Sequence, residues 1–248
     1  MNNPKEMSKR QSRREQMRRK ETRNRYIAIG LISAVAVLVA FLIIYPNFKP
    51  VGAISTAPEV SRSNVKFNAA GNPDAPIRVD EYSDFQCPYC RQFFEDTETK
   101  LMETFVADGT VYFVYNSFGD FIGAESARAA EAAYCAGDQE KFWEMHDTIF
   151  VNQTGENVGA YTDRRLSAFA EKLELDMDTF RSCFNGGDYK ELVTQDAKDG
   201  LAAGLQATPS FVLSYTVNGE TKTRILSGAQ TYSAFQQEIE TILAEIGQ

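Results

Sequence analysis

The stretch Cys87-Pro88-Tyr89-Cys90 contains two thiols separated by two residues, between an apolar-rich segment and an amphipathic one that is compatible with a helix. Two cysteines at this spacing on the first turn of a helix can close a small disulfide ring and reopen it with little backbone movement. The first sulfur would face unpaired backbone N–H groups and the positive end of the helix dipole, which stabilise a thiolate. Because the thiolate is the nucleophile in disulfide exchange, the motif predicts reactive dithiol chemistry.

The segments on either side of the dithiol predict a strand, a helix and a second strand. Residues 77–82 alternate between apolar and polar types, as a half-buried strand does. After the dithiol, Phe94, Leu101 and Phe105 recur at intervals of seven and four and mark one apolar helical face. Residues 111–115 are aromatic and β-branched, which favours a strand. This order predicts a parallel pair of strands with a right-handed crossover.

A helical block and a hairpin follow. We expect helices near residues 124–136, 138–150, 163–173, 176–185 and 188–204. Strand character resumes at residues 211–213, and Asn218-Gly219 is a hairpin turn into residues 223–226. The chain ends in a helix that repeats apolar residues at intervals of three and four. The order predicts one α/β core with a helical insertion over about residues 120–206.

The N-terminal region is strongly basic. Residues 1–25 carry ten Lys/Arg and three Asp/Glu, a balance of +7, whereas the whole chain of 248 residues carries −8, so the remainder carries −15. We expect residues 1–25 to be a disordered, basic cytoplasmic N-terminus. Basic runs also occur in nucleic-acid-binding proteins, but a membrane segment follows this one at once. We therefore expect no nucleic-acid partner.

Residues 26–45 are twenty consecutive uncharged positions, nearly all apolar. As a helix they would span about 30 Å, the thickness of a bilayer's hydrocarbon core. The sequence therefore predicts a single transmembrane helix, with the basic residues in the cytoplasm and the following residues outside. A cleaved secretory signal is the alternative, because Val51-Gly52-Ala53 and Ser55-Thr56-Ala57 each resemble a cleavage site. The Pro-, Gly- and Ser-containing residues 46–64 predict a linker between the helix and a folded domain at 65–248.

All four cysteines follow the predicted membrane segment, where disulfides persist. Of the three possible pairings, the short spacing selects Cys87 with Cys90, which leaves Cys135 with Cys183. We expect the latter pair to be a structural disulfide that braces the helical insertion. A second redox relay or a four-cysteine zinc site is the alternative, although zinc sites normally have two close pairs. We predict no metal.

The motifs together resemble the DsbA-like branch of the thioredoxin superfamily. The resemblance rests on Glu81 near the end of a strand, on the run from Asp84 to Cys90, and on Thr208-Pro209 before the hairpin. It covers roughly residues 65–248 and is strongest to membrane-anchored bacterial disulfide oxidoreductases with the same helical insertion. It implies an α/β, thioredoxin-like fold with an inserted α-helical domain, here preceded by a single N-terminal transmembrane helix.

The resemblance implies a role for each residue of the dithiol motif. Cys87 corresponds to the exposed nucleophile, and Cys90 to the more buried resolving partner. Pro88 fits early in a helix, where its missing N–H costs nothing, and Tyr89 offers a ring and a hydroxyl near the sulfur. Pro-Tyr also occurs in glutaredoxins and in a periplasmic isomerase relative, so this dipeptide leaves the direction of exchange open.

Two further elements of the family match this sequence. Glu81 lies six residues before Cys87, where the superfamily keeps a buried acid that can exchange a proton with the second cysteine. Asp80 and Glu81 point to opposite faces of the strand, so alternation alone does not decide which is buried. Thr208-Pro209 resembles the cis-proline element, in which residue 208 presents its backbone to an extended substrate chain. An ordinary trans proline at the start of a strand is the alternative.

Two other features carry little weight for function. His146 is the only histidine of the chain and lies in an aromatic-rich segment, which is more typical of packing than of catalysis. Asn152-Gln153-Thr154 matches a glycosylation sequon, a pattern that is frequent by chance. We place neither in the site.

The sequence thus predicts a membrane-anchored thiol-disulfide oxidoreductase whose catalytic domain lies outside the cytoplasm. We expect an oxidase that donates the Cys87–Cys90 disulfide to exported proteins, and the family implies a quinone-linked membrane reoxidant, DsbB-like or VKOR-like. The alternatives are an isomerase or reductase with a narrower set of clients and, from another class, a tethered metal-binding or binding module without redox turnover. No Gly-rich phosphate loop or haem motif is present in the sequence, so we expect no cofactor. We expect a monomer.

Overall fold

The computed structural model describes residues 9–45 and 51–247. The chain divides into two compact units, Met1–Pro50 and Val51–Gln248. In the first unit, α1 (Lys9–Ile44) begins within the basic region, so residues 9–25 are helical where we expected disorder. The reason is local, because this stretch contains Arg, Lys, Gln and Glu, which are good helix formers, and neither Gly nor Pro. Residues 1–8 lie outside the described part.

The second half of α1 contains the apolar run. Within α1, residues Arg13–Ile44 form a helix that is long and apolar enough to cross a membrane. The expected span, residues 26–45, falls within this helix except for its last residue. Its side chains are exposed, as a lipid-facing helix requires.

The segment of residues 51–64 differs from the linker that we expected. It has almost no regular secondary structure, yet Ile54 and Val60 pack against the hydrophobic core of the second unit. Asn152 holds it by two hydrogen bonds, because its Oδ1 accepts from Ser55 N at 2.8 Å and its Nδ2 donates to Ser55 O at 3.0 Å. Ile54 and Val60 are isolated apolar residues without a helical or strand period, so no sequence pattern indicated this docking. Residues 46–50 lie outside the described residues.

The second unit contains a five-stranded sheet in the order β1-β3-β2-β4-β5. The strands are β1 (Ala69–Ala70), β2 (Ile77–Ser83), β3 (Val111–Ser117), β4 (Ser210–Val217) and β5 (Glu220–Ser227). β2 and β3 are parallel, as predicted from the intervening helix, and the other neighbours are antiparallel. Asn218 and Gly219, with φ angles of 53° and 81°, form the turn between β4 and β5.

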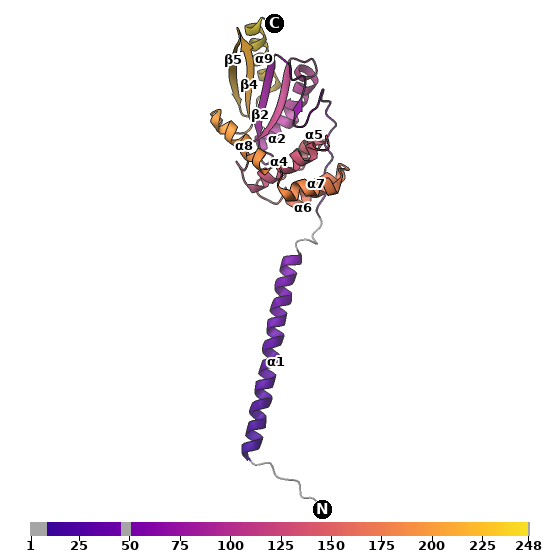
Figure 1. Cartoon of the computed structure of the whole chain (residues 1–248), viewed down its shortest axis with the longest axis vertical. Helices are drawn as coiled ribbons and strands as arrows, with labels where there is room; N and C mark the ends of the chain where they lie inside the picture. The colour runs from indigo at the N-terminus through magenta and orange to yellow at the C-terminus, as the bar shows by residue number, and fades with distance from the viewer. Residues whose placement is uncertain (1–8, 46–50, 248) are drawn as a thin grey trace, which may run out of the picture. The chain divides into compact units, whose positions relative to one another are not determined.

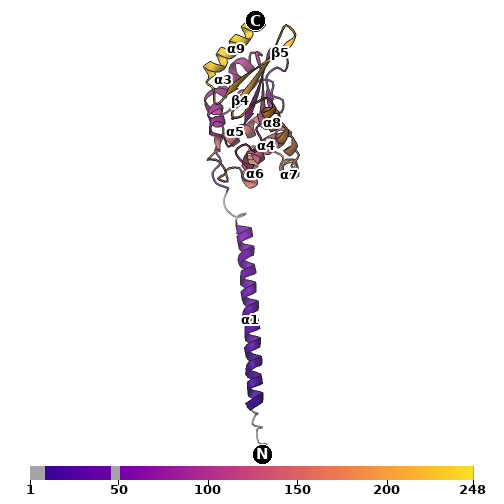
Figure 2. The same ribbon diagram turned by 90° about the vertical axis from the view of Figure 1, so that its left-hand side faces the viewer.

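Helices cover both faces of the sheet. The crossover from β2 to β3 is a continuous helical segment made of α2 (Pro88–Phe93), η2 (Phe94–Glu98), α3 (Thr99–Leu101) and η3 (Met102–Val106), with π-helical turns in η2 and η3. It shares one face with α9 (Tyr232–Ile246), and Figure 2 shows α3 and α9 together on the side of β4 opposite α8 (Lys190–Ala202). Phe93 packs against Phe113, Phe211 and Phe235, so aromatic side chains join the crossover helix to the sheet and to α9.

Between β3 and β4 the chain forms the helical part of the domain. Its remaining helices are α4 (Ala124–Gly137), α5 (Phe142–Val151), α6 (Asp163–Lys172) and α7 (Met177–Gly186). Figure 1 shows these helices gathered at one end of the sheet, the end at which β2 runs into α2. A disulfide between Cys135 and Cys183 joins α4 to α7. The dithiol motif therefore lies where the sheet meets the helical part.

Candidate functional site

The first cysteine of the motif occupies the N-cap position of α2, without a capping hydrogen bond from its side chain. Cys87 has extended backbone angles, φ −70° and ψ 122°, and Pro88 is the first residue of the helix. This is the local structure that Pro favours, because an N–H at the first helical position has no intrahelical partner. Cys87 is only 4% exposed, so it is buried where the resemblance implied an exposed nucleophile, and it lies against Thr208. Cys90 is fully buried one turn further on, and both are free thiols.

The two thiols have opposite acidities. The pKa of Cys87 is lowered to about 6, chiefly by the hydrogen bond from the Cys90 thiol, against the effect of burial, and further by Thr208 and by backbone N–H groups of α2. Burial raises the pKa of Cys90 well above its usual value, and the neighbouring Cys87 raises it further. The arrangement therefore concentrates negative charge on the sulfur nearer the surface.

This asymmetry predicts the titration of the reduced protein. We expect one thiolate to form with a midpoint near pH 6, the pKa of Cys87, while Cys90 stays protonated through neutral pH. Thiolate absorbance in the ultraviolet measures the midpoint, and Cys87→Ser should remove the transition. A midpoint at the ordinary value of a free cysteine would contradict the assignment of Cys87 as the activated thiol.

The peptide bond between Thr208 and Pro209 is cis, and this dipeptide lies against Cys87. In the thiol form, Cys87 Sγ donates a hydrogen bond to Thr208 O at 3.3 Å across a sequence separation of 121 residues. Pro209 precedes β4, so the sheet fixes this contact. The structure thus brings the proline element and the dithiol into one site.

Glu81 lies on the buried face of β2. It is 1% exposed, whereas Asp80 points to the other face and pairs with Arg78 at 2.6 Å. Burial raises the pKa of Glu81 well above its usual value, and the charge of Glu98 raises it further. The Ser83 hydroxyl acts in the opposite direction on Glu81 and also lowers the pKa of Cys90, so Ser83 lies close to both groups.

A loop of the helical part holds the backbone just before the dithiol. Gln153 Nε2 donates to Phe85 O at 2.7 Å and to Cys87 O at 3.1 Å. Tyr161 donates its hydroxyl to Phe85 O at 3.1 Å. Sequence reasoning missed both residues, because their partners are 66 to 76 positions away. The chance sequon that contains Gln153 begins at the buried Asn152, whose amide is engaged with Ser55.

Two exposed aromatic side chains belong to the active-site helix and to a loop that contacts the segment before it. Tyr89, two residues after Cys87, is 62% exposed, and Phe121 is 50% exposed. The loop that carries Phe121 is tied to the active-site segment, because Ile122 N donates to Asp84 Oδ2 at 3.1 Å. This surface can contact apolar residues of an extended chain.

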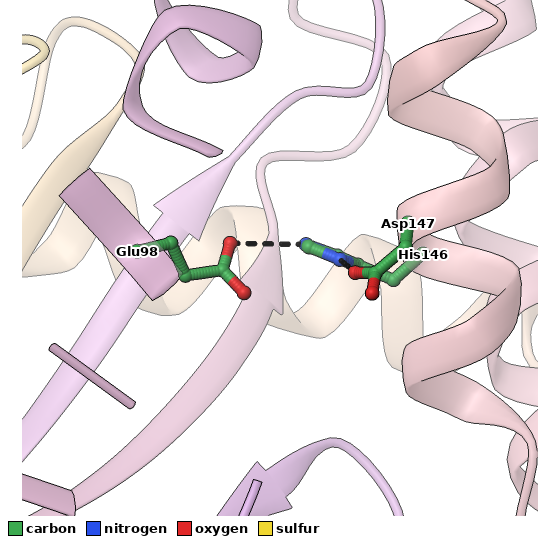
Figure 3. A group of neighbouring side chains, drawn as sticks. All are labelled: Glu98, His146 and Asp147. Carbon is green, nitrogen blue, oxygen red and sulfur yellow. Dashed lines mark hydrogen bonds and ion pairs between the residues drawn. The ribbon is translucent and has the colours of Figure 1, made fainter. Parts of the chain in front are cut away.

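A buried cluster of ionisable groups lies between η2, which carries Glu98, and α5, which carries His146 and Asp147. Glu98, His146 and Asp147 have donor atoms of metal-binding type within 4.8 Å of one another, and Figure 3 shows the Glu98 carboxylate facing the His146 ring. The guanidinium of Arg62 already pairs with both carboxylates, at 2.8 Å from Glu98 and 2.7 Å from Asp147. The cluster is therefore an ion-pair cluster in which Arg62 supplies the positive charge.

Part of this cluster had a sequence signal. Glu98 is four positions after Phe94 and three before Leu101, so it falls on the helical face that the apolar residues mark. A carboxylate on an apolar face indicates a buried charge that needs a partner. Its partner Arg62 lies in the segment that we expected to be a linker, where no pattern pointed to burial.

A family model and a similar bacterial protein each match most of this chain. The family model described as Thioredoxin matches residues 63–241. A probable disulfide bond formation protein D from Bacillus cereus is 30% identical over 200 residues, which cover 75% of this chain and 87% of that protein.

Two crystal structures resemble the fold. Oxidised BdbD from Bacillus subtilis has a TM-score of 0.62 at 23% identity, with 77% of this chain and 100% of that chain covered. Wolbachia pipientis α-DsbA1 has a TM-score of 0.63 at 20% identity, with coverage of 72% and 92%. These likenesses confirm the α/β fold class that the sequence predicted.

Proposed function

Because this chain belongs to the thioredoxin family and is a DsbA-like thiol-disulfide oxidoreductase, we propose that it works as an oxidase that donates the Cys87–Cys90 disulfide to exported proteins as they fold. One observation carries the proposed direction. The pKa of Cys87 is lowered to about 6, so the dithiol form is stabilised as a thiolate, and a stabilised thiolate is a good leaving group. A disulfide whose reduced form is stabilised is an oxidant.

The proposed reaction has two exchange steps. A substrate thiolate attacks Cys87 Sγ of the disulfide, a mixed disulfide forms, and Cys90 leaves as a thiolate. Because Cys90 is fully buried, that thiolate needs a proton, and we assign Glu81 as the group that donates it. A second substrate thiolate then attacks the substrate sulfur of the mixed disulfide. The substrate gains a disulfide, Cys87 leaves as a thiolate, and the pair holds the two electrons.

The surroundings of Cys87 would position the substrate. We assign Thr208 and Pro209 as the backbone wall against which an extended substrate lies, because Thr208 O is 3.3 Å from Cys87 Sγ. Tyr89 and Phe121 add exposed apolar surface beside it. We assign Pro88 to the start of α2, where it helps to set the N-terminal geometry around the sulfur.

The same proposal includes the cellular setting. The basic residues before the apolar run of α1 support a single-pass anchor in the cell membrane, with the N-terminus in the cytoplasm and the catalytic domain outside. There the reduced dithiol would pass its two electrons to a quinone-linked membrane partner of the DsbB or VKOR type. We propose that the protein acts as a monomer and that its domains follow the predicted order of basic N-terminus, membrane helix and redox domain.

Unfolding the two redox forms tests the direction. We expect the reduced protein to unfold at higher denaturant concentration than the oxidised protein. The folded pKa of Cys87 is depressed from 9.0 to about 6, so its contribution to the reduced form is fully present above pH 9 and is lost as the pH falls through 6. The advantage of the reduced form should therefore grow between pH 6 and pH 9, where the oxidised form has no thiol to titrate.

The unfolding measurement, together with thiol titration and metal analysis, distinguishes the alternatives. An oxidised form more stable than the reduced one would contradict the oxidase and favour a reductase. A Cys87 thiol that stays unreactive while the protein binds stoichiometric zinc would instead indicate a metal-binding module.

A further inference from the structure

The peptide unit that joins Cys87 to Pro88 can be held by hydrogen bonds only through its carbonyl. Proline has no backbone N–H, so Cys87 O is the one polar atom of this unit that can be bonded. Two donors reach it. Arg91 N, at 3.1 Å, closes the first turn of α2, and Gln153 Nε2, also at 3.1 Å, comes from the residues that follow α5. The start of the active-site helix is therefore held from outside the helix as well as from within it.

The amide of Gln153 also holds the chain two residues earlier. Its Nε2 donates to Phe85 O at 2.7 Å, so one side-chain amide spans the segment from Phe85 to Cys87. Gln153 is 9% exposed and is itself anchored, because Arg91 Nη1 donates to Gln153 O at 2.9 Å. The loop after α5 and the first turns of α2 thus position each other through three hydrogen bonds that involve Gln153.

The direction of the Cys87 carbonyl decides where the sulfur lies relative to the helix. This direction follows from the ψ angle of Cys87, which is 122°. Rotation about ψ turns the free N–H groups at the start of α2 relative to the Cβ–Sγ bond. Backbone N–H groups of Tyr89 and Cys90 lower the pKa of Cys87, together with the Cys90 thiol and Thr208. The contacts of the sulfur with α2 therefore depend on the angle that the bonds to Cys87 O hold.

We propose that Gln153 is a positioning residue for thiol-disulfide exchange, which holds the Cys87 carbonyl so that the sulfur stays aligned with the N-terminus of α2. The proposal rests on the function proposed above only in taking Cys87 as the exchanging thiol. Gln153 is uncharged and bonds the carbonyl, so it acts on the sulfur through backbone geometry. Without its amide the peptide unit keeps only the bond from Arg91 N, and the thiolate loses part of the stabilisation that a helix N-terminus supplies.

The adjacent residue, Asn152, provides a matched control. It is also a buried amide, 4% exposed, but its side chain faces the other way, toward Ser55 of the docked segment, residues 51–64. Its Nδ2 also donates to Thr148 O at 2.8 Å. Gln153→Met and Asn152→Leu each replace a buried amide by an apolar side chain of similar size, and each leaves polar partners unpaired, which lowers stability. Only Gln153→Met removes the donor to Phe85 O and Cys87 O.

The test measures the rate at which the reduced full-length protein, in detergent micelles, reacts with a small aromatic disulfide between pH 4 and pH 10. The Cys87 thiolate attacks one sulfur of the reagent, and the other sulfur leaves as a coloured thiolate. Cys90 does not compete, because it is fully buried and its pKa is raised. The midpoint of the rate profile reports the pKa of Cys87.

We expect the midpoint to rise from about 6 in the parent protein to about 7 in Gln153→Met, as part of the stabilisation of the thiolate is lost. The rate at the high-pH plateau should rise by about threefold, because a more basic thiolate is more nucleophilic. Loss of stability alone would produce neither change. Asn152→Leu should keep the midpoint and the plateau of the parent protein.

Two results would overturn the proposal: a parent midpoint in Gln153→Met, or an equal shift in both variants. The midpoint does not depend on the direction of exchange. A reductase that shows the expected shift would refute the oxidase and leave this inference standing. Conversely, an oxidase whose Gln153→Met variant keeps the parent midpoint would refute this inference alone.

Gln153→Asn covers the case in which Gln153→Met does not fold. It keeps a buried amide with its donors, but its side chain is one methylene shorter and cannot reach Phe85 O and Cys87 O together. The midpoint should again rise, by less than in Gln153→Met. A folded Gln153→Asn variant that reacts with the parent midpoint would count against the positioning role as directly as the first variant would.

Discussion

Cys87→Ser is expected to abolish catalysed thiol-disulfide exchange, with a loss on the order of a thousandfold or more, as when a catalytic nucleophile is removed. The reason is that Cys87 is the only described thiol with a lowered pKa, and it is the sulfur that contacts the Thr208 carbonyl. Oxidation of a reduced model substrate by the purified protein measures the effect. Folding should be preserved, since the serine hydroxyl can occupy the same position at the start of α2.

Cys90→Ala is the matched variant. It leaves the nucleophile in place but removes the resolving thiol. When the Cys87 thiolate attacks the disulfide of an oxidised model substrate, one substrate sulfur leaves as a thiolate and the mixed disulfide with Cys87 should accumulate, because no Cys90 thiol is present to displace it. These adducts are visible as reducible species of higher mass. If Cys87→Ser kept turning over, or if Cys87→Ser formed such adducts through Cys90, the assignment of roles within the motif would be wrong.

The second large effect is expected on stability. Removal of the Cys135–Cys183 disulfide by a double substitution to alanine should lower the free energy of unfolding by about 4 kcal/mol, from the chain entropy of closing a loop over a separation of 48 residues. Both half-cystines lie inside helices, α4 and α7, so the link acts on the helical part of the domain. Denaturant unfolding of the oxidised protein measures the change.

The control for this prediction is the redox centre itself. Cys135 and Cys183 lie in α4 and α7, whereas Cys87 lies at the start of α2 and contacts Thr208. The Cys87 thiolate should therefore titrate near pH 6 in the double variant, as in the parent protein. A lost exchange activity with unchanged stability would show that this disulfide is a second redox relay instead of a brace.

Much of the redox core followed from local sequence patterns. The alternation of residues 77–82 and the helical spacing of Phe94 and Leu101 predicted β2 and the helix that carries the dithiol, and these elements occur as expected. The turn Asn218-Gly219 predicted the β4–β5 hairpin. Each of these signals is contained within a few neighbouring residues, and such signals can be read before the chain is folded.

In the N-terminal region, charge and apolar spacing were not enough to predict the structure. The prediction of disorder over residues 1–25 was wrong from Lys9 onward, because charge was weighed without helix propensity. The docking of residues 51–64 was missed for another reason. Ile54 and Val60 make their contacts with residues far away in the chain, and two isolated apolar side chains have no period.

The sequence by itself determined the dithiol, its place at the start of a helix and the residue types that surround it, because spacing and capping are local properties of the chain. Only the tertiary structure decided that Glu81, and not Asp80, is the buried acid of β2. Glu81, Glu98 and Arg62 come from a strand, a helical segment and a docked segment, and their effect on one another depends on burial and proximity. Those two quantities exist only once distant parts of the chain have packed together and excluded water.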